Sequence, residues 1–284
     1  YTATTEYTEY TEYMFVKHPN SPVAGWRSWL VTLVGFLFVA AFALFILGLI
    51  LADAMYIDLA TLREVLQADF VWHALWMSCW TSVTTTILAM LFAIPMGYTL
   101  SHHRFWGRSL MDSIVDLPLI FPPLVAGLTL LVFFSQTHLG RWLEDSGFNF
   151  LFDPKGIILC QFMIAATFGI RSARTAFDDV DRRLENVALT LGYSRWGVFR
   201  RVSLPLAKNG IMAGAILTWA RAFGLFGPLI IVVGTVRGRT EVLSTTMFLE
   251  QSVGNLKIAL AIMLLMLAVA LFALLLIRLL GGMK

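Results

Sequence analysis

The chain has 284 residues, of which 58% are apolar and 14% charged, with a mean hydropathy of +0.76 and a formal net charge of +3. Soluble globular chains carry about 45–50% apolar and about 25% charged residues, so this composition excludes an ordinary cytosolic enzyme, a disordered protein and a nucleic-acid-binding domain. Two cysteines are too few for a disulfide scaffold.

The first thirteen residues contain the triplet Thr-Glu-Tyr three times, and Met14 follows directly. This repeat indicates an upstream leader with Met14 as the natural start, so we expect residues 1–27 to be a leader and a cytoplasmic tail. The first uncharged block, residues 28–52, has no small-residue cleavage pattern. It is therefore predicted to be a retained span rather than a signal peptide.

The apolar residues of the chain form six blocks, and only the fifth contains a charged residue, Arg221. A bilayer core needs about 20 apolar residues per helix. We therefore predict an all-α integral membrane protein, with six transmembrane helices in a domain that covers residues 28–284. The fourth block is short and must take residues from both flanks. The blocks are 28–52, 74–100, 117–136, 156–170, 209–236 and 258–277.

The distribution of Lys and Arg between the loops predicts the orientation. Fourteen of these residues lie in the segments on the N-terminal side of the membrane, and six lie in the segments on the other side. Cytoplasmic loops carry the excess of positive charge, so both termini are predicted to be cytoplasmic. The outer loops, residues 53–73, 135–155 and 235–257, are either a docking surface for a soluble partner or plain connectors.

The sequence lacks the motifs of common enzyme classes. It has no phosphate loop, no H-E-x-x-H or clustered Cys/His set, and no G-x-S-x-G elbow. We therefore expect no catalytic residue, no metal site and no cofactor in this chain. Cys79 and Cys160 fall inside spans and are expected to be reduced packing residues. His102 and His103 are interpreted as part of a basic loop at the lipid headgroups.

The cytoplasmic loop 171–208 contains a helical pattern. Val180, Leu184, Val187 and Leu191 follow the spacing i, i+4, i+7, i+11, which is one face of an α-helix. Asp178 or Asp181 is suited to cap the start of this helix, and Gly192 suits the left-handed position that ends it.

A second short helix is expected after the glycine. Ser194 is suited to cap its start, Trp196, Phe199 and Val202 supply apolar contacts, and Pro205 is expected to end it. Two short helices joined by a sharp turn between two spans would form a rigid lever on which a partner acts.

Two spans are interrupted by proline and glycine, which kink a helix or let backbones approach closely. We predict that these interrupted segments line a pore and its gate, because freed backbone groups can face a water-filled path. Taken singly, each residue is equally well explained as a simple bend. The third span has Pro118, Pro122, Pro123 and Gly127, and the fifth has Gly224, Gly227 and Pro228.

Arg221 is the charged residue well inside a span, and such a side chain usually faces protein or water. Either it attracts an anion, or it pairs with Asp112 or Asp116 near the inner end of the third span. If its helix is continuous, Arg221 lies about 18 Å from the inner end, which puts an inner-end partner out of reach.

The cytoplasmic loop 171–208 resembles the EAA loop of bacterial ABC importer permeases, whose pattern is E-A-A-x3-G-x9-I-x-L-P. Asn186 stands at the position of the family's glutamate, with a glutamate one residue earlier. The resemblance implies that this loop docks on an ATPase. Gly192, Leu204 and Pro205 match the pattern, whereas Val187 stands at the position of its first alanine. The residues that the resemblance assigns to ATPase coupling are Glu185, Asn186, Val187, Ala188, Gly192, Leu204 and Pro205.

Four further segments look like those of molybdate, tungstate and sulfate permeases, although Leu225 stands where the oxyanion permeases usually carry Glu. The segments are 116–127, 139–143, 171–177 and 221–227. The resemblance implies a type I ABC importer permease fold in a bacterial or archaeal cytoplasmic membrane. It also implies import of molybdate or tungstate, with sulfate next.

The implied partners are a second copy of the chain, two cytoplasmic ATPases that bind ATP and Mg, and an external substrate-binding protein. No nucleic-acid partner is expected. One alternative is an ABC permease for another small solute, such as a polyamine, a phosphonate or an iron complex. The other is a stand-alone channel or carrier, which should place paired carboxylates or histidines in its spans.

Overall fold

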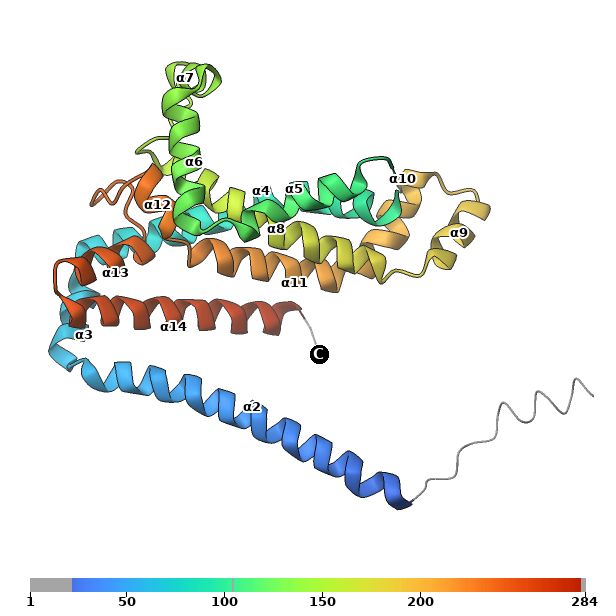
Figure 1. The fold of residues 1–284 in the computed structure, drawn as a ribbon, viewed down its shortest axis with the longest axis horizontal. Coiled ribbons are helices and arrows are strands. Elements are labelled where there is room, and N and C mark those ends of the chain that lie inside the picture. The colour runs from blue at the N-terminus through green and yellow to red at the C-terminus, as the bar shows by residue number, and fades with distance from the viewer. Residues whose placement is uncertain (1–21, 104, 282–284) are drawn as a thin grey trace, which may run out of the picture. The chain divides into compact units, whose positions relative to one another are not determined.

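The computed structural model describes the backbone of residues 22–103 and 105–281 and the side chains of residues 29–103 and 105–276. All regular elements in these residues are helices (Figure 1). They are α2 (Pro22–Tyr56), α3 (Leu59–Gln67), α4 (Asp69–His102), α5 (Arg108–Ile120), α6 (Pro123–Gln136), α7 (His138–Asp145), α8 (Pro154–Asp178), α9 (Arg182–Thr190), α10 (Arg195–Val198), the π-helix η1 (Phe199–Ser203), α11 (Leu204–Phe223), α12 (Gly227–Val232), α13 (Leu243–Ser252) and α14 (Leu256–Gly281).

The contacts divide the chain into two units, residues 1–55 and 56–284. The first unit contains nearly all of α2, so the first predicted span forms a helix that begins at Pro22, before the predicted boundary. The predicted leader, residues 1–13, lies outside the described residues. The second unit contains all the other helices, and both candidate sites lie in it.

Four helices in the described residues are long and apolar enough to cross a membrane: Trp29–Tyr56, Asp69–His102, Pro154–Asp178 and Leu256–Leu276. A fifth span results if α5 and α6, which are bent by 109° at a short break, are taken together. The fifth predicted block forms α11 and the six-residue α12, with Lys208 and Arg221 in α11. The structure thus supports four or five spans, and the count of six stays a prediction.

The short fourth block takes residues from both flanks, as expected. It forms α8, a helix of 25 residues and about 38 Å, which exceeds the hydrocarbon thickness of about 30 Å. The side chain of Asp153 caps its start by accepting a hydrogen bond from the backbone N–H of Lys155 at 3.1 Å. Pro154 then takes the first helical position, where its missing N–H costs nothing.

Helices α4, α8 and α11 pack closely because small residues lie where they meet. A Cβ placed on Gly97 of α4 would lie 2.8 Å from the backbone nitrogen of Arg174 on α8. A Cβ on Gly214 of α11 would lie 2.6 Å from the Cβ of Ser172. Such close backbone approach is typical of helix pairs in membranes, where packing replaces the hydrophobic effect.

A buried glutamine joins the same three helices. Gln161 of α8 is 1% exposed, and its Nε2 donates to the carbonyl oxygen of Ala222 at 3.1 Å. The hydroxyl of Thr85 on α4 donates to its Oε1 at 2.9 Å. Ala222 is fully buried and lies in the last turn of α11. The glutamine therefore satisfies a buried carbonyl near a helix end.

Both cysteines are free thiols. Cys160 is fully buried in an apolar cluster with Ile157 and Leu229, and Cys79 is partly buried. Their positions fit the predicted packing role.

Candidate coupling and gate sites

The turn between α9 and α10 forms as the sequence predicts. Asp181 caps α9 by accepting from the backbone N–H of Arg183 at 2.8 Å, and Ser194 caps α10 by accepting from that of Gly197 at 3.1 Å. Gly192 has φ +90°, the left-handed conformation that glycine adopts at no steric cost. The backbone N–H of Tyr193 donates to the carbonyl of Ala188 at 3.2 Å, which closes the end of α9.

The apolar face predicted for α9 points away from the chain's own core. Leu184, Val187 and Leu191 are 50%, 56% and 73% exposed, whereas Val180, before the helix, is buried. The residues of α9 that are buried are Glu185 and Ala188. This chain therefore leaves an apolar helix face uncovered beside a rigid turn, with Asn186 also exposed.

Pro205 does not end the second helix. From Arg195 the chain passes through α10, the π-helix η1 and α11 without leaving helical conformation, and Leu204 and Pro205 are the first two residues of α11. A proline ring removes one hydrogen bond and clashes with the carbonyl four residues earlier in an α-helix. The wider π turn lies just before Pro205, where the backbone N–H of Leu204 bonds to the carbonyl of Phe199, so the helix continues into α11.

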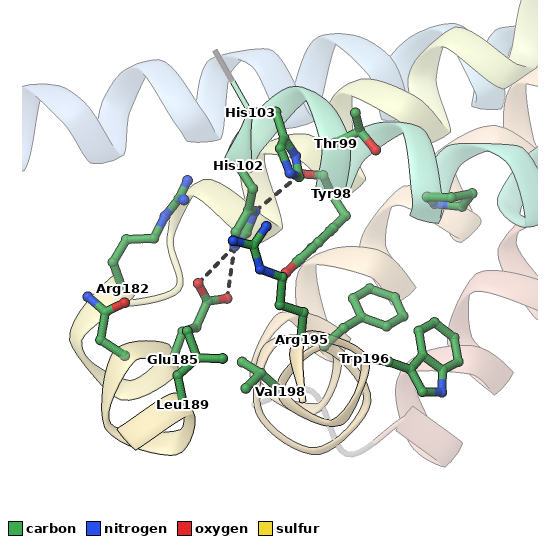
Figure 2. Close-up of a pocket in the computed structure, with 13 residues that line it drawn as sticks. Tyr98, Thr99, His102, His103, Arg182, Glu185, Leu189, Arg195, Trp196 and Val198 are labelled. Atoms are coloured by element: carbon green, nitrogen blue, oxygen red, sulfur yellow. Dashed lines mark hydrogen bonds and ion pairs between the residues drawn. The ribbon is translucent and has the colours of Figure 1, made fainter. Parts of the chain in front are cut away.

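Glu185 is held inside the chain rather than presented to solvent. Its carboxylate is 2.9 Å from Nε2 of His102, through both oxygens, and accepts a hydrogen bond from the Ser203 hydroxyl at 2.5 Å. Figure 2 shows His102 and Glu185 facing each other from α4 and α9. His102 was interpreted as a lipid-headgroup residue, and sequence spacing gave no signal for this contact, because 83 residues separate the pair.

A cavity of about 500 Å³ opens beside this pair, between the C-terminal end of α4, α9 and the α10–η1 segment (Figure 2). Arg182 and Arg195 lie on its polar side, and Tyr98, Trp196 and Phe199 line its apolar side. The Trp196 and Phe199 rings stack with centroids 5.3 Å apart.

The two interrupted spans meet at their glycines and prolines. A Cβ on Gly127 of α6 would lie 2.7 Å from Cα of Pro228, and a Cβ on Gly227 would lie 3.0 Å from Cβ of Pro123. The two segments thus touch backbone to backbone at the break after α11. Pro122 caps α6 and is exposed, and Gly224 caps the end of α11, where an added Cβ would lie 3.5 Å from the carbonyl oxygen of Ala220.

Polar side chains satisfy backbone groups at this break and at the start of α13. At the break, the Ser244 hydroxyl donates to the carbonyl of Leu225 at 2.6 Å. At the first residue of α13, the Ser78 hydroxyl accepts from the backbone N–H of Leu243 at 2.8 Å. Irregular backbone at membrane depth needs such partners.

Arg221 projects from α11 to the surface of this chain. Its guanidinium lies over the Phe168 ring, 5.8 Å from the centroid. Neither suggested carboxylate is its partner, since Asp112 pairs with Arg174 at 2.6 Å and Asp116 with Arg171 at 3.1 Å. Within the described residues Arg221 makes no ion pair.

The loops predicted to face outward contain the short helices α3, α7 and α13. Beside α13, Glu241 is fully buried, and Nε of Arg237 lies 3.9 Å from its carboxylate. Burial raises the pKa of the Glu241 carboxyl. Arg237 forms its closer ion pair with Glu250. The described residues contain no group of three His, Cys, Asp or Glu side chains arranged to hold a metal ion.

The fold resembles that of solved ABC importers. One match is a bacterial ABC transporter involved in the import of the acidic polysaccharide alginate, with a TM-score of 0.66, 20% identity and coverage of 89% of this chain and 96% of the other. The MetNI methionine ABC transporter in inward-facing conformations matches with a TM-score of 0.56, 15% identity, and coverage of 72% and 94%. The fold is therefore that of an ABC importer membrane subunit.

Residues 89–282 match the family described as the binding-protein-dependent transport system inner membrane component, and the chain belongs to this family. The resemblance to ABC permeases is confirmed. The chain is a multi-pass inner membrane permease subunit, with no catalytic role of its own.

Several curated relatives carry names that refer to oxyanions. The molybdate/tungstate transport system permease protein WtpB of Thermococcus kodakarensis is 37% identical over 62% of this chain and 66% of its own length. A probable molybdenum ABC transporter permease protein of Haloferax volcanii is 45% identical over 50% of this chain and 51% of its own length. The sulfate transport system permease protein CysW of Escherichia coli is 30% identical over 79% of this chain and 78% of its own length. The chain thus spans about half to two thirds of the first two relatives.

Proposed function

We propose that this chain forms the translocation path of an ATP-driven importer for molybdate or tungstate. Two copies surround the path, two ATPases carrying ATP and Mg bind inside, and a substrate-binding protein docks outside. Each copy has six spans with both termini in the cytoplasm. Helices α11 and α12 together form the fifth of these spans in chain order.

The observation that carries the proposal is the uncovered apolar face of α9 beside the Gly192 turn. Leu184, Val187 and Leu191 are half or more exposed, although apolar side chains gain free energy when buried. Contiguous exposed apolar residues outside the bilayer mark protein interaction sites. An ATPase that covers this face can move α9 as a unit, because caps at both ends fix the turn.

The gate is proposed at the meeting of the interrupted spans. Gly127 and Gly227 allow α6 and α12 to approach closely, so a small rotation of either helix opens or closes the path. Pro122, Pro123, Gly224 and Pro228 shape the same segments. Arg221 lies one short segment earlier on α11 and supplies a positive charge suited to an anionic solute.

The oxyanion assignment is supported by the names of the relatives and by the charge of Arg221. Sulfate is the second candidate, because the sulfate permease match covers more of both chains than the molybdenum matches. Uptake of labelled molybdate, tungstate and sulfate by the complete complex in proteoliposomes, each in competition with the other two, distinguishes these solutes. The assignment would be contradicted if the complex took up none of the three anions and none of them inhibited its transport.

The coupling role is tested by Val187→Glu, which places a charge on the uncovered face of α9. Copurification of the ATPase and ATP-driven uptake are both expected to fall at least about tenfold, because the charge must be desolvated at the interface. The matched control is Val236→Glu, a similarly exposed valine in the loop after α12, 45% exposed against 56%. Normal copurification with Val187→Glu would refute the docking surface.

A further inference from the structure

His102 and Glu185 connect the inner end of a long membrane helix to the helix beside the Gly192 turn. Their side chains are 9% and 8% exposed, and Nε2 of His102 lies 2.9 Å from each carboxylate oxygen. His102 is the last residue of α4, and the Tyr98 ring stacks on it with centroids 3.9 Å apart. A second contact supports the same joint, since Nη2 of Arg182 donates to the carbonyl of Ser101 at 2.8 Å.

Both nitrogens of the His102 ring have a partner. Nδ1 lies 3.2 Å from the backbone carbonyl of Tyr98, and Nε2 lies 2.9 Å from the Glu185 carboxyl. The same carboxyl accepts a hydrogen bond from the Ser203 hydroxyl. Loss of the histidine would leave a buried carboxyl with fewer partners, which is unfavourable.

We propose that His102 is a positioning residue that ties α9 to α4 through Glu185, so that movement of α9 is transmitted to the helix bundle. The inference rests on the proposed function of α9 as the helix that docks on the ATPase. Helix α4 packs along α8 and α11 through glycine contacts, so a displacement at its inner end reaches both helices. Without the His102–Glu185 contact, α9 keeps only the Arg182 contact with Ser101, so less of its movement is transmitted to α4.

The test compares uptake per ATP hydrolysed in proteoliposomes that contain the complete complex. His102→Leu removes the partner of the buried Glu185 carboxyl, and this ratio is expected to fall about tenfold. His102→Gln restores a side-chain N–H that can donate to Glu185 and is expected to recover most of the ratio. The control is His103→Gln, the next residue, whose side chain is exposed and does not contact Glu185 within the described part of the chain. It should leave the ratio unchanged.

If His102 only stabilised the structure, uptake, ATP hydrolysis and the melting temperature would fall together, and uptake per ATP hydrolysed would stay constant. A His102→Leu ratio within twofold of the unmodified complex would overturn the inference. If this variant does not assemble, Ser203→Ala removes only the hydroxyl that orients Glu185, and an unchanged ratio there would overturn it as well. If the unmodified complex shows no ATP-driven uptake, the proposed function is refuted. This outcome is distinct from the one that overturns the inference about His102, which requires an active unmodified complex.

Discussion

Replacing Gly192 with valine tests whether the turn between α9 and α10 transmits force. Gly192 has φ +90°, and an added Cβ would meet no atom within 4 Å, so the cost is confined to the backbone. An L-residue in the left-handed conformation costs about 1–2 kcal/mol. Since about 1.4 kcal/mol is a tenfold change in a population, the native turn becomes about 5- to 30-fold less favoured.

A second glycine in the chain provides a matched control. Gly254, after α13, has φ +88°, open space around its Cβ position, and the same pair of closing backbone hydrogen bonds. Gly254→Val should therefore lower the melting temperature of the purified complex by about as much as Gly192→Val. Only Gly192→Val should reduce uptake per ATP hydrolysed in proteoliposomes. Normal coupling in Gly192→Val, or an equal loss in Gly254→Val, would refute the reasoning.

Four other changes test separate features. Gly227→Leu overpacks the contact with α6 and should block uptake, so unhindered uptake would exclude a gate there. Arg221→Gln should slow oxyanion uptake about tenfold with an unchanged melting temperature, whereas a lower melting temperature alone would indicate a structural role. Cys79→Ala with Cys160→Ala should transport normally at a stability cost of about 1 kcal/mol, and loss of uptake with an intact fold would contradict this. Burial raises the pKa of Glu241, so the folded state binds its proton more tightly and loses stability as the pH rises. Glu241→Gln should therefore raise the melting temperature at pH 8 and flatten its pH dependence, and parallel curves would show otherwise.

Local features of the site could be predicted from the sequence because they depend on neighbouring residues. Asp181, Gly192 and Ser194 act within three or four positions of themselves, so their capping and turn roles follow from residue type and spacing. The apolar blocks likewise indicate the long helices, since a span needs an uninterrupted apolar run.

The direction in which α9 faces was decided by tertiary structure. An amphipathic pattern shows that one face avoids water, but not whether this chain or another covers it. Here Glu185 takes the buried position because His102 and Ser203 satisfy its carboxylate, and the apolar face is left free. Tertiary structure also decided the role of Pro205. Residue type predicts a helix end there, but the chain continues from the π-helix η1 into α11.

The meeting of the two interrupted spans also depended on the fold. The sequence marks Gly127 and Pro228 only as breaks in separate helices, about a hundred residues apart. They come into contact because α4, α8 and α11 pack through small residues and bring the α6 and α12 segments together. Sequence periodicity is a local quantity, whereas a contact between distant residues is determined by how whole helices pack against one another.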